Sequence, residues 1–435
     1  MGSFEEAAGP HRNWKPWIET PIIESAALSR DVGCRVFLKL ENLQPSGSFK
    51  SRAIGNLVLS HISNPSNHGK NLHFFLPSGG NAGLAASKAA KSLGYQCTVV
   101  APRTLNPSMA DRLRGAGATV ITHGETIAEA ARYMREVLME ELKVESGTQN
   151  TVDNDTGSSN DTDTVAIELH PFDHERIWEG GSTLVDELAH QLPPPDIDDE
   201  FEMRNFSDKP LPVDGIICSV GGGGLMNGII QGVERHVKIH NRGKSQRRPP
   251  PSVVNGGPDN DNNNNIHIIA TETYGAESLS LSIAQRSLIK LPAITSQASS
   301  LGVVTIAQRT LENALTPPAG VEVHSLVLHD SQAARGVLRL LDDEKLLVEL
   351  ACGVSVEAAV VKDVDVSMNG CMGKKGNGAA DTPPLTSRLA RIIPNFGPKS
   401  RVVIVVCGGG NVTLPMLMEW KQRLENGWGS AEVCS

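Results

Sequence analysis

A lysine in a short segment of small residues is the first place where this chain could do covalent chemistry. Lys50 ends the stretch Pro45-Ser46-Gly47-Ser48-Phe49-Lys50, which follows a strand-like run at 36–40. Burial of an amine lowers its pKa toward neutrality, and the neutral amine can act as a nucleophile, a Schiff-base partner or a proton carrier. Most lysines are exposed surface charges, so Lys50 becomes a catalytic candidate only together with segments that hold a ligand.

Four consecutive glycines form the strongest candidate for an anion site. Gly221, Gly222, Gly223 and Gly224 follow an apolar run at 215–220 and precede a predicted helix. Backbone N–H groups at the start of a helix can converge on a phosphate when no side chain intervenes. A tight strand-to-helix turn needs only one or two glycines, which favours a ligand here. The spacing matches neither a Walker loop nor the G-x-G-x-x-G dinucleotide fingerprint.

Two further loops follow predicted strands. Ser78-Gly79-Gly80-Asn81 precedes an alanine-rich helix, where its amides and short polar side chains can bind a carboxylate or simply cap the helix. Cys407 follows a strongly apolar strand at 402–406 and precedes Gly408-Gly409-Gly410-Asn411. A lone cysteine at a strand end is more often an inert core residue than a functional one, but the glycines after it favour the close approach of a ligand.

Strands and helices alternate along the chain. The predicted strands are 73–77, 97–101, 119–122 and 213–220, and the predicted helices are 82–93, 127–142 and 225–237. This order is typical of a parallel α/β architecture.

Composition indicates a protein that binds small molecules. The 435 residues suffice for two domains, and a net charge of −9 disfavours nucleic acid and anionic membranes as partners. The first eight residues lack the pattern of a secretory signal, and no apolar run is long enough to span a membrane, so we expect a cytoplasmic protein. Seven cysteines without CxxC spacing argue against zinc and against a disulfide framework.

Polar segments interrupt the pattern at 145–164, 241–265 and 363–384. They are rich in residues such as Ser, Asn, Asp and Gly, and the second ends in a run of asparagines. Because such segments cannot bury enough apolar surface to fold, we predict disordered surface insertions.

Lys50 and the three loops that follow predicted strands together supply the groups needed to hold pyridoxal phosphate and an amino acid. The groups are one amine, a loop for a phosphate, a loop for a carboxylate and a polar atom at the end of a strand. The chain resembles the fold type II (β-family, tryptophan-synthase-β-like) pyridoxal-phosphate enzymes, and among them is most similar to the liver-type L-serine dehydratases. The matching stretches follow the family order between Thr20 and Met416, and they are Ser46–Lys50, Ser78–Gly83, His170–Asp173, Ile177–Gly180, Ser219–Leu225, Glu272–Ala276 and Cys407–Gly409.

The resemblance implies an α/β fold of two parallel-type domains with the cofactor in the cleft between them. Residues 1–43 and 165–435 would form a discontinuous large domain that binds the cofactor, and residues 44–144 a small domain on the substrate side. A homodimer is implied as well.

The resemblance also assigns roles to single residues. Lys50 would form the Schiff base with the cofactor and act as the catalytic base. Phe49 would pack on the cofactor ring, Asn81 would contact the ring hydroxyl, and Cys407 would face the pyridine nitrogen. Ser300 stands where the family often has an alanine that packs on the ring.

Three groups of residues complete the implied site. The glycine loop from Gly221 to Gly224 would bind the cofactor phosphate, and the loop of Ser78, Gly79, Gly80 and Asn81 would bind the substrate carboxylate. Enzymes of this type also hold a monovalent cation, potassium, and the corresponding ligands in this chain are Glu272, Ala276, Ser278, Leu301 and Val303.

The implied reaction is an α,β-elimination of amino-acid catabolism and gluconeogenesis. L-Serine would give pyruvate and ammonia, and L-threonine would give 2-oxobutyrate. A neutral thiol beside the pyridine nitrogen favours elimination over transamination. The alternatives are a threonine dehydratase-type preference, a β-replacement enzyme such as a cysteine or cystathionine synthase, and a non-catalytic module that binds a phosphorylated ligand.

Overall fold

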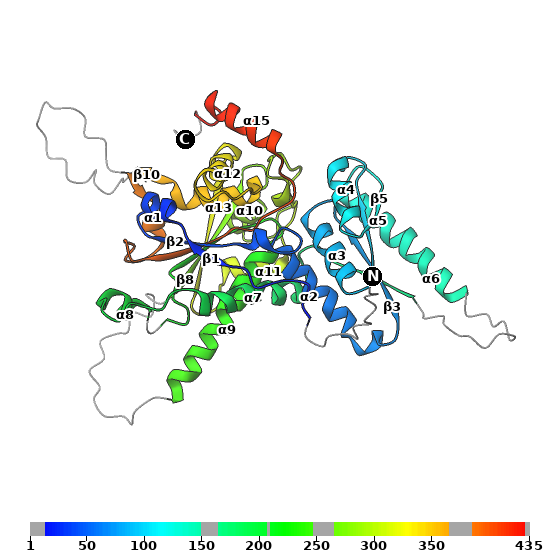
Figure 1. Cartoon of the computed structure of the whole chain (residues 1–435), viewed down its shortest axis with the longest axis horizontal. Helices are drawn as coiled ribbons and strands as arrows, with labels where there is room; N and C mark the ends of the chain where they lie inside the picture. Colours follow the sequence, from blue (N-terminus) through cyan, green and yellow to red (C-terminus); the bar gives the residue numbers. More distant parts are fainter. Residues whose placement is uncertain (1–13, 149–163, 207–208, 247–264, 365–384, 431–435) are drawn as a thin grey trace, which may run out of the picture. The chain divides into compact units, whose positions relative to one another are not determined.

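The chain forms two compact units (Figure 1). The computed structural model describes residues 14–148, 164–206, 209–246, 265–364 and 385–430. The small unit consists of Met1–Ile18 and Lys50–Pro171, and the large unit consists of Glu19–Phe49 and Phe172–Ser435. The division falls between Phe49 and Lys50, so these two neighbouring residues of the predicted site belong to different units.

The small unit is built on a parallel four-stranded sheet in the order β5-β4-β3-β6. Its strands are β3 (Asn71–Pro77), β4 (Gln96–Ala101), β5 (Thr119–Thr122) and β6 (Thr164–Glu168). Its helices are α2 (Lys50–Ile62), α3 (Asn81–Ser92), α4 (Pro107–Gly115), α5 (Ile127–Tyr133) and α6 (Met139–Thr148), the last two joined by a wider helical turn at Met134–Leu138. Parallel neighbours need crossover connections, and these helices supply them.

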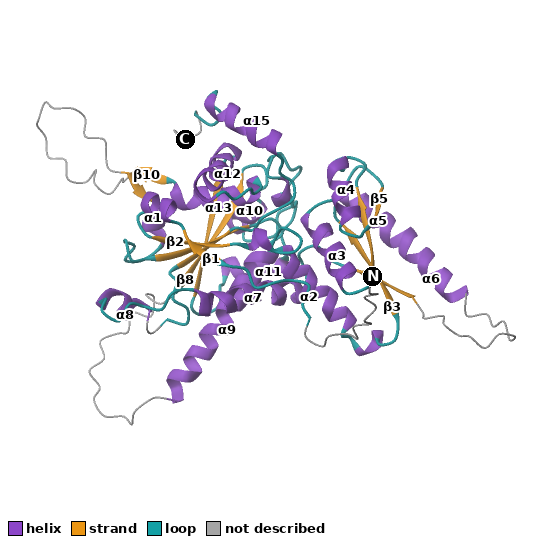
Figure 2. Ribbon diagram, viewed as in Figure 1, coloured by secondary structure: helices purple, strands orange, loops and turns teal. Residues whose placement is uncertain are grey.

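The large unit is built on a six-stranded sheet in the order β1-β2-β12-β7-β8-β9, in which β1 is antiparallel to β2 and the other five strands are parallel. Every residue of β7, β8 and β12 is buried, as expected for a parallel sheet covered on both faces. Helices α12 and α13 lie on one side of this sheet and α7 and α9 on the other (Figure 2). Among the described residues, no helix is both long and apolar enough to cross a membrane.

The elements of the large unit have the following bounds. The strands are β1 (Ile22–Glu24), β2 (Arg35–Lys39), β7 (Gly215–Ser219), β8 (Ile266–Thr273), β9 (Val321–Leu328), the hairpin pair β10 (Lys362–Val364) and β11 (Leu385–Ser387), and β12 (Arg401–Val405). The helices are α1 (Ala26–Val32), α7 (Glu175–Gln191), α8 (Glu200–Phe206), α9 (Gly224–Gln246), α10 (Ser278–Gln285), α11 (Gln308–Leu315), α12 (Asp330–Glu344), α13 (Leu350–Val360), α14 (Leu389–Ile392) and α15 (Leu414–Glu425).

The domain boundaries differ from those expected. The family resemblance predicts that residues from 165 onward belong to the large domain, whereas β6 pairs in parallel with β3 and so completes the small sheet. The resemblance also predicts that residues 44–49 belong to the small domain, whereas hydrogen bonds of Gly47 and Phe49 with the loop after β12 hold them in the large unit.

The predicted insertions at 145–164, 241–265 and 363–384 lie largely outside the described residues. Their described ends continue regular elements, because α6 runs to Thr148, α9 runs to Gln246 and β10 runs to Val364. Helix α9 passes its predicted end at 237, where Lys238 forms an ion pair of 2.6 Å with Glu234 one turn earlier. Such pairs support a solvated helix that lacks an apolar face.

Candidate active site

Lys50 is the first residue of helix α2, and its side chain is partly buried. Its Nζ atom donates a hydrogen bond of 2.6 Å to the carbonyl oxygen of Pro171, in the same unit. Desolvation lowers the pKa of Lys50 to about 8. A substantial fraction of this amine is therefore neutral just above physiological pH, which an exposed lysine is not.

The residue before Lys50 is tied to the predicted cysteine loop. The backbone N–H of Phe49 donates to the carbonyl oxygen of Cys407 at 3.1 Å, and the N–H of Gly409 donates to the carbonyl oxygen of Gly47 at 2.9 Å. Gly408 has a φ of +80°, and a Cβ atom there would lie 2.3 Å from the Gly47 carbonyl oxygen. This contact needs glycine, and it brings the predicted ring-packing phenylalanine next to the predicted cysteine.

The Cys407 thiol is a neutral group. It is 5% exposed, and the Ser219 hydroxyl donates to its Sγ atom at 3.5 Å. A hydrogen bond with the thiol of Cys352, burial, and the nearby carboxylate of Glu349 raise the pKa of Cys407 well above its usual value. The end of β12 therefore presents a protonated thiol with no charge.

The glycine loop is closely packed on one side. A Cβ atom on Gly222 would lie 2.3 Å from the Phe172 ring, and one on Gly223 would lie 1.9 Å from the Thr310 hydroxyl. Gly223 also has a φ of +93°, which favours glycine. The loop is held from this side, because the N–H of Ala307 and the Thr310 hydroxyl both donate to the carbonyl oxygen of Gly222, at 3.1 and 3.2 Å.

The other polar groups of the loop suit an anion. Among the described residues, no atom accepts a hydrogen bond from the backbone N–H of Gly221, Gly222, Gly223 or Gly224. The last of these begins the 23-residue helix α9, whose N-terminal dipole is positive. A phosphate group fits a cradle of such amides.

Glu349 is a functional candidate that the sequence reasoning missed. It is 4% exposed and accepts hydrogen bonds from the Ser300 hydroxyl and, at 2.5 Å, from the backbone N–H of Asn411. It also lies against Gly409, where a Cβ atom would be 2.1 Å from the carboxyl carbon. Its only local signal is an acidic residue directly before the apolar helix α13.

These contacts join most of the predicted cofactor residues within the large unit. The backbone of Phe49 is hydrogen-bonded to that of Cys407. The carboxylate of Glu349 accepts hydrogen bonds from Ser300 and from the loop that follows Cys407. Next to Ser300, the backbone of Leu301 lies 3.3 Å from the position of a Cβ atom on Gly221. Five sequence segments, far apart in the chain, therefore meet at the carboxyl end of the sheet.

The predicted carboxylate loop lies in the small unit between β3 and α3. Its Gly80 N–H donates to the Ser78 hydroxyl at 3.4 Å, and α3 begins at Asn81 without a side-chain cap. A Cβ atom on Gly79 would lie 2.7 Å from Leu105, and one on Gly83 would lie 2.4 Å from the Ser78 carbonyl oxygen. Because Gly80 has no side chain to cap α3, the backbone N–H groups of the first turn of this helix are suited to an anionic group.

Of the predicted cation ligands, Glu272 and Ser278 lie close together at the start of α10. Glu272 is fully buried, and its carboxylate accepts hydrogen bonds from the N–H groups of Leu279 and Ser280 at 2.7 and 2.8 Å. Burial nevertheless raises its pKa to about 8. Beside these contacts, the buried Ser278 hydroxyl and one Glu277 carboxylate oxygen have no hydrogen-bond partner in the described part of the chain.

The other three predicted ligands are less closely tied to this carboxylate. Ala276 donates its N–H to the Thr273 carbonyl oxygen and so lies in the turn between β8 and α10. Among the described residues, no hydrogen bond joins Glu272 to Leu301 or Val303. Burial disfavours the charged form of Glu272, and buried oxygens without a hydrogen-bond partner in the described ranges lie next to it. A hard cation would bind such oxygens and stabilise the carboxylate.

Comparison with known proteins identifies the family of this chain. The chain matches the family described as pyridoxal-phosphate dependent enzyme over residues 14–369. It is 33% identical to a serine dehydratase-like protein of Rattus norvegicus (93% of this chain, 94% of the relative) and 32% identical to an L-serine dehydratase/L-threonine deaminase of Bos taurus (94% and 95%). A fungal L-serine ammonia-lyase from Rhizomucor miehei has a similar structure, with a TM-score of 0.66, 26% identity and coverage of 94% of this chain and 99% of that one. The glycine cradle, the amine of lowered pKa and the matched family agree, and the chain belongs to the pyridoxal-phosphate dependent enzymes.

Proposed function

We propose that this chain is a deaminating dehydratase that converts L-serine to pyruvate and ammonia, and L-threonine to 2-oxobutyrate. The observation that carries this proposal is the neutral, buried thiol of Cys407, bonded through its backbone to the residue that precedes Lys50. The names of the rat and fungal relatives refer to serine, and the name of the bovine relative refers to both serine and threonine, which supports these substrates.

In this proposal the residues of the chain hold the cofactor as follows. The N–H groups of the glycine loop would bind the phosphate, Lys50 would be the attachment point, Phe49 and Ser300 would pack on the ring, and Asn81 would contact its hydroxyl. When bound, pyridoxal phosphate supplies a conjugated ring that spreads the electron pair left when the Cα–H bond breaks.

Three parts of the chain have separate roles in the proposed reaction. The Ser78 to Asn81 loop binds the substrate carboxylate at the N-terminus of α3, which orients the Cα–H bond. Lys50 takes the Cα proton, because its lowered pKa leaves the amine free to accept one near neutral pH. Cys407 would offer the ring nitrogen a neutral partner, which favours loss of the Cβ hydroxyl over return of a proton to Cα. The hydroxyl would leave as water, and the proton it takes up balances the one that Lys50 removes.

The pKa of Lys50 predicts how the cofactor-free protein takes up pyridoxal phosphate. Only the unprotonated amine reacts with the aldehyde, so the rate of uptake should rise about tenfold per pH unit up to about pH 8 and then level off. Stopped-flow absorbance measures this rate. Free Nα-acetyllysine, followed in parallel, corrects for ionisation of the cofactor, and a corrected uptake rate that still rises tenfold per unit at about pH 10 would contradict the pKa.

Replacement of Cys407 by aspartate should change the reaction outcome. A carboxylate beside the ring nitrogen would hold a proton there and stabilise charge at Cα, so transamination and racemisation should rise relative to elimination. The ratio of pyruvate to side products from L-serine measures the change. Cys407→Ser is the matched control because its hydroxyl is also neutral, and equal product ratios in the two variants would argue against this role of the thiol.

We further propose that Glu272, Ala276, Ser278, Leu301 and Val303 bind a potassium ion. An ion there stabilises the folded protein by a free energy that grows with its concentration, about 2.7 kcal/mol at a hundredfold excess over the dissociation constant. Raising potassium at constant ionic strength, with tetramethylammonium as the balancing cation, should therefore raise the melting temperature of the parent protein. The shift should vanish in Glu272→Gln and persist in the exposed control Glu125→Gln; a shift that survives in Glu272→Gln would place the ion elsewhere.

The function itself is tested by supplying substrates to the purified holoenzyme. Pyruvate and ammonia in equal amounts from L-serine support the proposal, and the ratio of kcat/KM for L-serine and L-threonine sets the preference. Formation of a thioether or of cysteine when homocysteine or sulfide is added, without pyruvate, would instead indicate a β-replacement enzyme. Light scattering tests the homodimer, which stays a prediction, as does the cytoplasmic location.

A further inference from the structure

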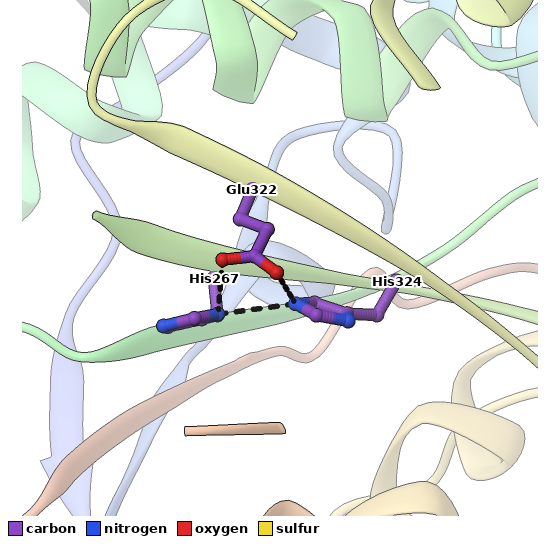
Figure 3. Close-up of side chains that lie close together, drawn as sticks. All are labelled: His267, Glu322 and His324. Carbon is purple, nitrogen blue, oxygen red and sulfur yellow. Dashed lines mark hydrogen bonds and ion pairs between the residues drawn. The ribbon is translucent and has the colours of Figure 1, made fainter. Parts of the chain in front are cut away.

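Three potential metal ligands meet at the amino ends of two neighbouring strands. His267 is the second residue of β8, and Glu322 and His324 lie at the start of β9. The parallel register places His267 opposite Glu322 and Ile269 opposite His324. Because side chains alternate between the faces of a sheet, all three ligands share one face, as Figure 3 shows.

The distances suit a single small ion. His267 Nδ1 lies 3.0 Å from His324 Nε2, and the two oxygens of Glu322 lie 3.7 Å from the first nitrogen and 3.6 Å from the second. Two ligands bound about 2.1 Å from one tetrahedral zinc ion are roughly 3.4 Å apart, and these distances bracket that value. In the described part of the chain this is the one group of three such residues whose ligand atoms all lie within 4.8 Å.

The protonation state of the cluster also suits a metal. Burial lowers the pKa values of His267 and His324, against the opposing effect of Glu322, and so favours the neutral imidazole in both. Each neutral ring has one nitrogen lone pair available for a metal. Without an ion, the facing nitrogens share one hydrogen bond, and they have no other partner except Glu322 among the described residues.

The cluster is separate from the candidate active site. Glu272 lies five residues further along β8, about 17 Å away at 3.3 Å per residue, and by alternation faces the other side of the sheet. The glycine loop and Cys407 likewise follow the carboxyl ends of β7 and β12. His267 and its partners lie at the opposite, amino end of the same sheet.

We propose that His267, Glu322 and His324 form a second metal site that takes zinc or a similar divalent transition-metal ion. Two imidazoles and one carboxylate favour zinc over magnesium or calcium, which prefer all-oxygen sites. Glu322 is half exposed, so the ion can enter from solvent and keep a water molecule as its fourth ligand. The bound ion ties β9, the edge strand of the sheet, to β8. The cysteine spacing gave no sign of this site because its ligands come from other residue types on two strands.

Cobalt(II) is the probe that tests the site in the intact holoenzyme. After treatment with a chelator and its removal, titration should give one equivalent of bound cobalt per chain. The visible absorbance should be that of a four- or five-coordinate ion, without thiolate charge-transfer bands, and an equivalent of zinc should displace it. Absence of saturable binding, or a spectrum dominated by thiolate ligands, would overturn the proposal.

Substitutions then locate the bound ion. Two single variants, Glu322→Gln and His324→Gln, are compared. Glu322→Gln changes an exposed side chain and should fold normally. Each variant should weaken cobalt binding by roughly tenfold or more. His236→Gln is the matched control, because His236 also pairs with a carboxylate, that of Asp186 at 2.9 Å. Zinc should raise the melting temperature of the parent and of the control but of neither cluster variant. Binding that is unchanged in both cluster variants would place the ion elsewhere and overturn the proposal.

Discussion

Replacement of Lys50 by alanine should lower the rate of pyruvate formation from L-serine by at least about 1,000-fold. The variant loses both the attachment point of the cofactor and the base that takes the Cα proton, and each contribution is large. The visible absorbance of the bound cofactor should also be lost or shifted. Steady-state assays at saturating pyridoxal phosphate measure the loss of rate, and far-UV circular dichroism checks that the fold is kept.

The matched control for this variant is Lys88→Ala. Lys88 lies on α3 in the same unit, and its side chain is exposed. It should keep the parent rate within a factor of about two, because exposed substitutions away from special features rarely matter. If Lys50→Ala kept more than a tenth of the parent rate, another group would be the base.

The second large effect is expected at Gly223. Alanine there would hold its Cβ atom 1.9 Å from the Thr310 hydroxyl at a φ of +93°, so the loop must move. The strained backbone and the overlap together should cost at least about 2 kcal/mol of unfolding free energy. Displacement of the loop amides should weaken pyridoxal phosphate binding by at least about tenfold, or 1.4 kcal/mol. Denaturant unfolding and equilibrium cofactor titration measure the two effects.

Gly243→Ala, in the helix that follows the glycine loop, provides the control. Gly243 lies near the end of α9, and a Cβ atom there meets nothing within 4 Å. Because alanine is the better helix former by about 1 kcal/mol, this variant should be as stable as the parent or more so, with unchanged cofactor affinity. Equal cofactor affinity of the Gly223 and Gly243 variants would show that the glycine loop does not hold the phosphate.

The parts of the site that could be predicted from sequence are those set by short-range pattern. Lys50, the glycine loop and Cys407 each follow a strand and belong to a recognisable local stretch. The strand at 119–122 was predicted with its observed bounds, and the strand predicted at 213–220 corresponds to β7 at Gly215–Ser219. Local alternation and glycine chemistry suffice for such elements.

The parts that could not be predicted depend on long-range register. Glu349 lies 49 residues from Ser300 and 62 from Asn411, so its buried carboxylate shows no local pattern. The pairing of His267 with Glu322 depends on the register of β8 and β9, and β6 joins the small sheet only through its partner β3. No spacing rule in one sequence encodes which strands become neighbours.

The central claim is that Lys50 is the residue to which pyridoxal phosphate is attached. Borohydride reduction of the holoenzyme, followed by proteolysis and mass spectrometry, tests it directly. We predict one pyridoxyl group per chain, on the peptide that contains Lys50 and on no other lysine. A cofactor that is released after reduction, or that is found on a different lysine, would contradict the account.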